Sequence, residues 1–341
     1  MTTQIARFRQ PFSGKTALKL LLAIVGVVLG VVLAWMTIRN VSWSSMEDAL
    51  GRMSWDVLVP AVAAAIVATV LQAIRWKLLL PGESVSTARL FLVRNAGLTV
   101  NNLALARGVL GEASELAMLT HSDNICAAKV TASIFMSRAL DFLVTSAFLL
   151  AGFIVLPQLS GFRAVIVPVF VVAAVILAVV LLAKRISRLP ILKKVKAVES
   201  SLHEVHALGH HSTLWLSVSL TVLAPLLLGT AAWLVAQALG IHLSFWMVGI
   251  LLVSINLLAG IIPSGFSGIG VYEFAAVSVL GLFAVNRSDA LAFAMIVHAL
   301  VVFPALIIGI PTLCREQRAF RGVAGQVGVL FGRSRGDQPL P

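Results

Sequence analysis

The residues best suited to chemistry lie in a glycine-rich break, PSGFSGIGVYE (residues 263–273), that interrupts a long apolar segment. The preceding helix must end at or before Pro263, and a new helix that begins near Ile269 would point its free N–H groups and positive dipole end into the protein. This arrangement predicts a binding site for an anion such as a phosphate, with serine and tyrosine hydroxyls as further donors. The residues assigned to the site are Asn256, Ser264, Gly265, Ser267, Gly268, Gly270, Tyr272 and Glu273.

Glu273 is the one acidic residue of this segment, and two interpretations of it are open. It falls in the first turn of the predicted helix, where the dipole favours a carboxylate that accepts hydrogen bonds from backbone amides. The other interpretation is a cation partner or proton acceptor in a polar cavity. We favour the second, because an ionisable residue inside a membrane usually has a functional role. His298, in the last apolar segment, is interpreted as a hydrogen-bonded core residue rather than a proton relay.

A second interrupted segment spans residues 89–120, and its apolar part from Leu90 to Leu105 contains Arg94 and three asparagines. A lipid-facing helix with these groups would leave polar atoms unpaired in hydrocarbon, at a cost of several kcal/mol each. A re-entrant hairpin, buried among other helices and returning to the side from which it entered, avoids this cost. Its candidate site residues are Asn102, Arg107, Gly111 and Glu112, and Glu115 receives the same interpretation.

Arg138 and Asp141 are also candidates, because they are three residues apart and therefore share one face of a predicted helix. They form either a structural ion pair with each other or part of the lining of a polar pathway. Intramembrane charges serve both purposes, so both interpretations stay open.

The elements that must position these residues are membrane helices. Of the 341 residues, 59% are hydrophobic and 12% charged, and the mean hydropathy is +1.00, which excludes a water-soluble domain. Several apolar runs reach the roughly 20 residues that a helix needs to cross a bilayer, and the alternating pattern of a barrel strand is absent. We expect an all-α, polytopic membrane protein with about six full spans plus two opposed re-entrant hairpins. The expected spans are residues 18–38, 56–80, 130–156, 164–183, 214–239 and 290–313.

Basic residues flank these spans and set the expected orientation. The net charge of +12 comes from residues that would meet anionic lipid head groups, and we expect no nucleic-acid partner. The positive-inside bias places both termini in the cytoplasm and makes Arg75, Trp76 and Lys77 a cytoplasmic anchor. The expected parts are an N-terminal cytoplasmic segment (1–17), one transmembrane domain (18–313) with a basic cytoplasmic loop (184–212) that forms an amphipathic helix on the inner leaflet, and a disordered cytoplasmic tail (314–341).

Starting from both termini, we assign the beginning and end of each segment to one side of the membrane. The resulting topology predicts an inverted repeat. Half one (about 55–156) and half two (about 214–313) each contain a span, a hairpin and a span, and they run in opposite directions. Each hairpin has an asparagine before a glycine-containing break that is followed by a glutamate. Short broken segments at corresponding positions of inverted halves indicate a transport site near the midplane. The alternative is that both broken segments cross the membrane fully through compact polar turns.

Enzyme and metal motifs are absent from the sequence, which contains no Walker loop, HExxH or GxSxG. Cys126 and Cys314 are interpreted as small apolar residues in the packing rather than as reactive thiols. The histidines at positions 203, 206, 210 and 211 are interpreted as a solvated face rather than a metal site. We therefore expect a protein that is not an enzyme and has no cofactor or metal.

Four stretches carry a resemblance to a known family. PSGFSGIGVYE resembles the PxSxGGxGxxE-like signature of the lysylphosphatidylglycerol synthetase transmembrane region, the flippase-like integral membrane family. NNLALARGVLGEASELAML is similar to its earlier motif, SRALDFL to its ERxxD segment and IRWKLLL to its arginine-containing second span. The resemblance covers about Leu18 to Leu313. The chain departs from the pattern at Arg107, Glu115 and Ser137, which stand where proline, arginine and an acidic residue are usual.

The resemblance implies a lipid translocase of the bacterial inner membrane. Such a protein moves a polar or aminoacylated phospholipid head group between leaflets, and we expect it to do so without ATP and without an aminoacyl-transferase domain. A membrane phospholipid is the expected partner, and a homo-oligomer is left open. The alternatives are a secondary transporter of a small anionic solute and a non-transporting membrane partner of a lipid-modifying enzyme.

Overall fold

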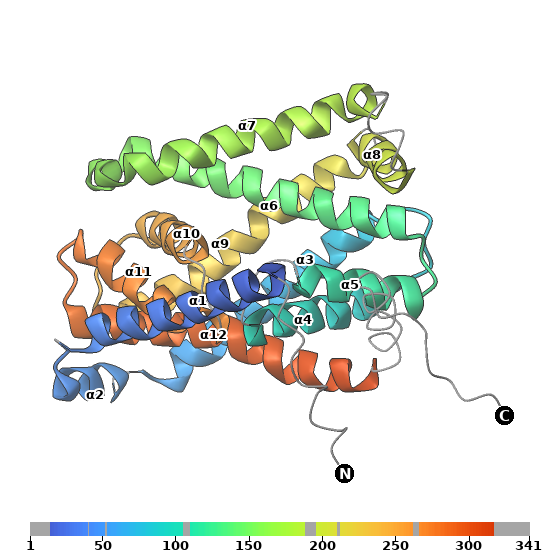
Figure 1. The fold of residues 1–341 in the computed structure, drawn as a ribbon. Helices are drawn as coiled ribbons and strands as arrows, with labels where there is room; N and C mark the ends of the chain where they lie inside the picture. The colour runs from blue at the N-terminus through green and yellow to red at the C-terminus, as the bar shows by residue number, and fades with distance from the viewer. Residues whose placement is uncertain are drawn as a thin grey trace, which may run out of the picture.

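A computed structural model describes residues 14–39, 41–51, 53–104, 110–187, 196–209, 212–261 and 266–316. All regular elements in these ranges are helices, and the long ones form a bundle (Figure 1). Five of the described helices are long and apolar enough to cross a membrane. They are α3 (Trp55–Leu78), α6 (Ala127–Val155), α7 (Arg163–Ile186, with its apolar span at Val167–Ile186), α9 (Leu214–Ala238) and α12 (Arg287–Arg315). The all-α, polytopic membrane architecture expected from the sequence is therefore confirmed.

The remaining helices are shorter, apart from α1 (Gly14–Ile38), whose 25 residues match the first expected span. α4 and α10 have 17 residues each, and α5 and α11 have 12 and 11. The 11 residues of α11 fall well short of the roughly 20 that a crossing requires, which favours a hairpin over two full spans in the second half. The shorter elements are α2 (Trp43–Gly51), α4 (Thr87–Leu103), α5 (Leu110–His121), α8 (Lys196–Gly209), α10 (Phe245–Ile261) and α11 (Val271–Gly281), with the 3-10 helices η2 (Pro157–Phe162) and η4 (Phe266–Gly268).

The two halves of the chain repeat one another in helix length and in packing. α3 and α9 have 24 and 25 residues, and α6 and α12 have 29 each. α3 packs along α9, while each hairpin packs on a long helix of the other half: α4 on α12, and α10 on α6. In Figure 1 the α4–α5 hairpin lies toward the end of the bundle where α12 ends, and α10–α11 lies toward the end where α12 begins. These relations support the inverted repeat with opposed hairpins.

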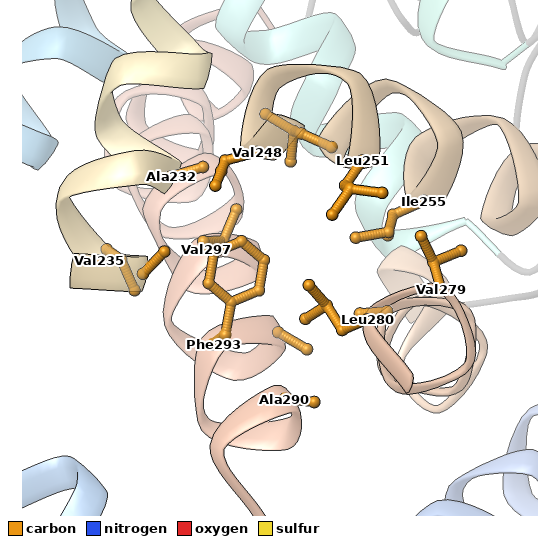
Figure 2. Close-up of a cluster of buried hydrophobic side chains, with 14 of the residues drawn as sticks. Ala232, Val235, Val248, Leu251, Ile255, Val279, Leu280, Ala290, Phe293 and Val297 are labelled. Atoms are coloured by element: carbon orange, nitrogen blue, oxygen red, sulfur yellow. The ribbon is translucent and has the colours of Figure 1, made fainter. Parts of the chain in front are cut away.

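The core of the second half is an apolar cluster between α9, α10, α11 and α12 (Figure 2). Phe293 of α12 fills its centre, with Val235 of α9, Leu251 of α10 and Leu280 of α11 around it. Many of the buried residues of α3 and α9 are small, including Ala61 and Ala232. Small residues let helix backbones approach closely, and helix association in lipid depends on such packing because lipid tails are as apolar as the helices.

Two expectations about the basic segments are wrong. Arg75 and Trp76 are buried and do not form a cytoplasmic anchor. The predicted amphipathic helix is present as α8, but Val205 and Leu208 pack against α6 and α7, so these apolar side chains face the protein rather than the inner leaflet. Most of the expected N-terminal segment (residues 1–13) and of the tail (residues 317–341) lies outside the described residues.

Charged groups tie the base of the first hairpin to the end of α12. Arg89 of α4 pairs with Asp123 at 3.0 Å and with Glu316 at 2.7 Å, and Ser122 donates to Glu316 at 2.5 Å. Partial burial acts to raise the pKa of Glu316, but the hydrogen bonds from Ser122 and Arg89 outweigh it and hold that pKa below its ordinary value. The carboxylate therefore stays charged and holds this end of the bundle together.

Cysteine labelling tests the expected orientation. Cys126 and Cys314 are exposed, so the expectation that they pack as small apolar residues is wrong. Both belong to the end of the bundle that the sequence places in the cytoplasm, whereas Ala284 is exposed in the turn between α11 and α12 at the other end. We expect a membrane-impermeant maleimide added outside intact cells to leave the wild-type protein unlabelled. The same reagent should label Ala284→Cys in a chain that also carries Cys126→Ser and Cys314→Ser. Labelling of the wild-type protein from outside would overturn this orientation.

Candidate functional site

A cavity of about 270 Å³ lies between the two halves. Residues of α3, α4, α6, α9, α10, α11 and α12 line it, together with Ser267 of η4. Its polar lining groups are Asn102, Thr145, Asn256, Ser267, Tyr272 and His298, and apolar residues such as Leu228, Leu252 and Val301 form the rest. Four of the predicted site residues, Asn102, Asn256, Ser267 and Tyr272, are thus brought together from hairpins far apart in the sequence.

The glycine-rich break builds one side of this cavity. α10 ends at Ile261, two residues before Pro263, and α11 begins at Val271. Ser267 has a φ of 62°, and Gly268 and Gly270 have φ values of 79° and 87°. Left-handed angles of this kind are easy for glycine and uncommon for serine, so the turn needs its glycines to reverse the chain in so few residues. Ser264 and Gly265 lie outside the described residues.

Glu273 makes the contact expected of a residue in the first helical turn, and it also contacts a histidine of α12. Its Oε2 accepts a hydrogen bond from the Gly270 amide at 2.6 Å, as a residue in the first helical turn is expected to do. Its Oε1 lies 2.8 Å from Nδ1 of His298. The carboxylate therefore occupies part of the N-terminal end of α11, the place where the sequence predicts an anion.

His298 is the functional candidate that sequence reasoning undervalued. It is hydrogen-bonded, as predicted, but it also lines the cavity. Its Nε2 lies 3.1 Å from the carbonyl oxygen of Ser267 and 3.4 Å from its Oγ, and its ring centroid is 4.4 Å from that of Tyr272. The spacing of His298 from Glu273 in sequence, 25 residues, carries no helical or turn signal that could have revealed the pair.

The first hairpin contributes a link of its own to the cavity. Ser267 of η4 donates from Oγ to Oδ1 of Asn102, near the end of α4, at 3.3 Å. The neighbouring Asn101 accepts from the Gly111 amide at 2.9 Å and contacts Glu112 at 3.4 Å. The asparagine pair therefore closes its own hairpin through one side chain and reaches the opposite hairpin through the other. Arg107 lies outside the described residues.

The remaining predicted residues form a charged cluster that does not line the cavity. Arg138 pairs with Glu112 at 2.7 Å, whereas Asp141 pairs with Arg75 at 2.5 Å. The interpretation of Arg138 and Asp141 as an ion pair with each other is therefore wrong, because each finds a partner on another helix.

Arg75 is the second residue that sequence reasoning missed. Its two terminal nitrogens both reach Asp141, and they also donate to Ser137 at 2.6 Å and Thr221 at 3.0 Å. A further pair, Arg94 with Glu115 at 3.6 Å, is buried beside it. Of the described residues, three arginines and three acidic residues make up this cluster, which balances their formal charges: Arg75, Arg94, Arg138, Glu112, Glu115 and Asp141.

Comparison with known proteins places the chain in a family. A sequence model of the lysylphosphatidylglycerol synthase TM region matches residues 23–309, which include both hairpins, the cavity and the charged cluster. A comparison with curated proteins found no match. Because the family match extends over most of the 341 residues, the protein belongs to the lysylphosphatidylglycerol synthase TM region family.

Proposed function

We propose that the protein moves the polar head group of a membrane phospholipid between leaflets, with the cavity between the halves as the path. The observation that carries the proposal is that the tips of both hairpins supply polar groups to one cavity. Asn102 comes from the first hairpin and Ser267 from the second. Family membership supports a role in lipid modification or transport.

The size of the cavity suits a head group and not a whole lipid. Its 270 Å³ equals about nine water volumes at roughly 30 Å³ each. Hydroxyl, amide and imidazole groups on one side would replace the hydration of a phosphate or amine. The acyl chains would remain in the surrounding lipid. The polar groups of the head would stay in the cavity, where none of them is left unpaired in hydrocarbon.

The proposed movement involves no chemical step on the lipid. It is driven by a lipid gradient or by coupling to an ion, and the bacterial inner membrane with cytoplasmic termini remains the proposed location. The chain would act with phospholipid as its partner.

Leaflet exchange in proteoliposomes tests the proposal. Fluorescent phosphatidylglycerol, phosphatidylethanolamine and aminoacylated phosphatidylglycerol are each placed in vesicles, and bleaching of the outer leaflet reports exchange. We expect at least one of these lipids to exchange faster than in empty vesicles. Rates equal to those of empty vesicles for all three lipids would reject the proposal.

Filling the cavity should block this exchange. Ala231 of α9 lines the cavity, and Ala231→Phe would place a phenyl ring in the path. We expect the exchange rate to fall toward that of empty vesicles, because the ring would occupy the path. Val171→Phe is the matched control, because Val171 is exposed on α7 away from the cavity lining and its added volume faces lipid. Equal loss in both variants would point to general destabilisation instead.

A secondary transporter of a small anionic solute is the second candidate function. The observation that favours it is the same volume, which would hold a small carboxylate or a free phosphate completely. Uptake of radiolabelled phosphate or of a dicarboxylate into proteoliposomes, without lipid exchange, would replace the lipid proposal by this one.

A further inference from the structure

Each hairpin has a carboxylate that contacts a basic side chain, and these two pairs occupy matching positions in the repeat. Glu112 lies near the start of α5, directly after Gly111, and Glu273 lies in the first turn of α11. Arg138 and His298 are each the twelfth residue of a 29-residue helix, α6 and α12. The carboxylate lies 2.7 Å from its partner in the first pair and 2.8 Å in the second. One structural position therefore holds a permanently charged partner in half one and a titratable partner in half two.

Each ring nitrogen of His298 lies close to an oxygen atom that accepts hydrogen bonds. Nδ1 is 2.8 Å from the Glu273 carboxylate, and Nε2 is 3.1 Å from the Ser267 carbonyl oxygen. These two contacts are satisfied together only if each nitrogen carries a hydrogen, which makes the ring an imidazolium. In the neutral ring the hydrogen stays on Nδ1 beside the carboxylate, and the lone pair of Nε2 then opposes the carbonyl oxygen.

The hydroxyl group of Ser267 responds to this change because it has a single hydrogen to donate. Its Oγ lies 3.3 Å from Oδ1 of Asn102 and 3.4 Å from Nε2 of His298. When Nε2 carries a hydrogen, the hydroxyl can donate only to Asn102, and this bond joins η4 to α4. When Nε2 is bare, it becomes the better acceptor, and Asn102 loses its donor.

Few other groups compete for the proton. Among the described residues packed around His298, the titratable side chains are Glu273 and Tyr272, both on α11. α4 presents Asn102 and η4 presents Ser267, which are neutral. The cavity-lining residues of α3 and α9, among them Ala65 and Leu228, are apolar.

We propose that His298 and Glu273 form a proton-binding site that locks the tips of the two hairpins together while the imidazolium is present. Loss of the Nε2 proton to water in the cavity turns the Ser267 hydroxyl away from Asn102 and releases the lock. The equivalent pair in half one holds the guanidinium of Arg138 in place of the imidazole, so that pair lacks the proton-dependent contact of the second hairpin. The lock rests on these contacts alone. Its use to couple lipid movement to a proton gradient rests on the proposed function.

Distance measurements between the hairpin tips test the lock without reference to transport. Leu103 and Ile269 are exposed neighbours of Asn102 and Ser267, and each takes a spin label as Leu103→Cys and Ile269→Cys in the chain without Cys126 and Cys314. Histidine changes charge between about pH 5 and pH 8. We expect a narrow distribution of distances between the two labels at the acidic end of this range. At the alkaline end we expect a broader distribution or one shifted to longer distances.

Two substitutions of His298 separate proton binding from simple packing. His298→Arg copies the partner found in half one, and we expect a narrow distribution at both ends of the pH range. His298→Gln cannot gain a proton, and we expect a distribution that does not change with pH. His203→Gln removes an exposed histidine of α8 and should retain the wild-type response. The inference is overturned if the wild-type distances do not change with pH, or if His298→Gln retains the change.

Lipid exchange over the same pH range tests the coupling. We expect exchange by the wild-type protein to rise by about 2- to 10-fold from the acidic to the alkaline end, the factor that corresponds to loss of one hydrogen bond. Lipid exchange by the His298→Arg variant should be slow at both ends of the pH range. Exchange that is present but independent of pH would reject the coupling and leave the proposed function standing. Distances that change with pH in a protein without lipid exchange would reject the proposed function and leave the lock standing.

Discussion

Replacing Arg75 by alanine should lower the free energy of unfolding by about 3 kcal/mol, since it leaves the partly buried carboxylate of Asp141 without its counter-charge. Arg75 is 1% exposed and binds Asp141 through two nitrogens. Asp141 has 34% of its side chain exposed, so some hydration would return, and we place the loss at the lower end of the range of about 3–5 kcal/mol known for broken buried pairs. Unfolding in mixed detergent micelles measures the change.

Two further variants show whether charge or packing causes this loss. Arg75→Lys keeps the charge but cannot reach Asp141 bidentately, and we expect an intermediate loss. Arg75→Met combined with Asp141→Leu removes both charges, and it should recover most of the stability because a buried ion pair is often no better than apolar residues of similar volume. If the double variant were as unstable as Arg75→Ala, packing of the arginine side chain would be the cause instead.

Gly270→Ala should destabilise the protein by about 3 kcal/mol or more, through backbone strain together with steric overlap between the added methyl group and α1. Gly270 has a φ of 87°, an angle that costs an L-residue roughly 1–2 kcal/mol. An added Cβ would also meet the backbone carbonyl oxygen of Gly30 at less than van der Waals distance and the Cβ of Ala34 at 2.9 Å. Overpacking of this kind costs typically about 1–3 kcal/mol, and α1 would have to move to relieve it.

The matched control for this variant is Gly249→Ala in α10. Gly249 lies inside a helix, and nothing lies within 4 Å of the Cβ that alanine would add. We expect a gain of about 0.5–1 kcal/mol, because alanine loses less conformational entropy than glycine in a helix. Thermal unfolding of both variants in detergent gives the comparison. Equal stability of Gly270→Ala and the wild-type protein would mean that α1 does not hold the turn as the structure shows.

Local features of the fold could be predicted from the sequence because they depend on neighbouring residues. The bilayer demands long apolar helices with paired backbone groups, so hydropathy alone located the spans. Pro263 and the glycines after it predicted the break between α10 and α11, and the structure has the helices end and begin there. Glu273 was expected in the first helical turn, and its bond to the Gly270 amide confirms that position.

Which charges pair could not be predicted, because pairing depends on contacts between distant segments. Arg75 and Asp141 are 66 residues apart, and Ser267 and Asn102 are 165 apart. Sequence spacing placed Arg138 and Asp141 on one helical face, yet the packing of α5 and α3 against α6 offers each of them a different partner.

By itself, the sequence determined a helical membrane protein with two broken segments that carry acids. Only the tertiary structure decided that these segments meet at one cavity, that Arg75 is a buried partner rather than an anchor, and that His298 completes the pair with Glu273. The physical reason is that helix formation is set by local backbone hydrogen bonding, whereas a charge in hydrocarbon takes whichever counter-charge the packing of the bundle brings to it.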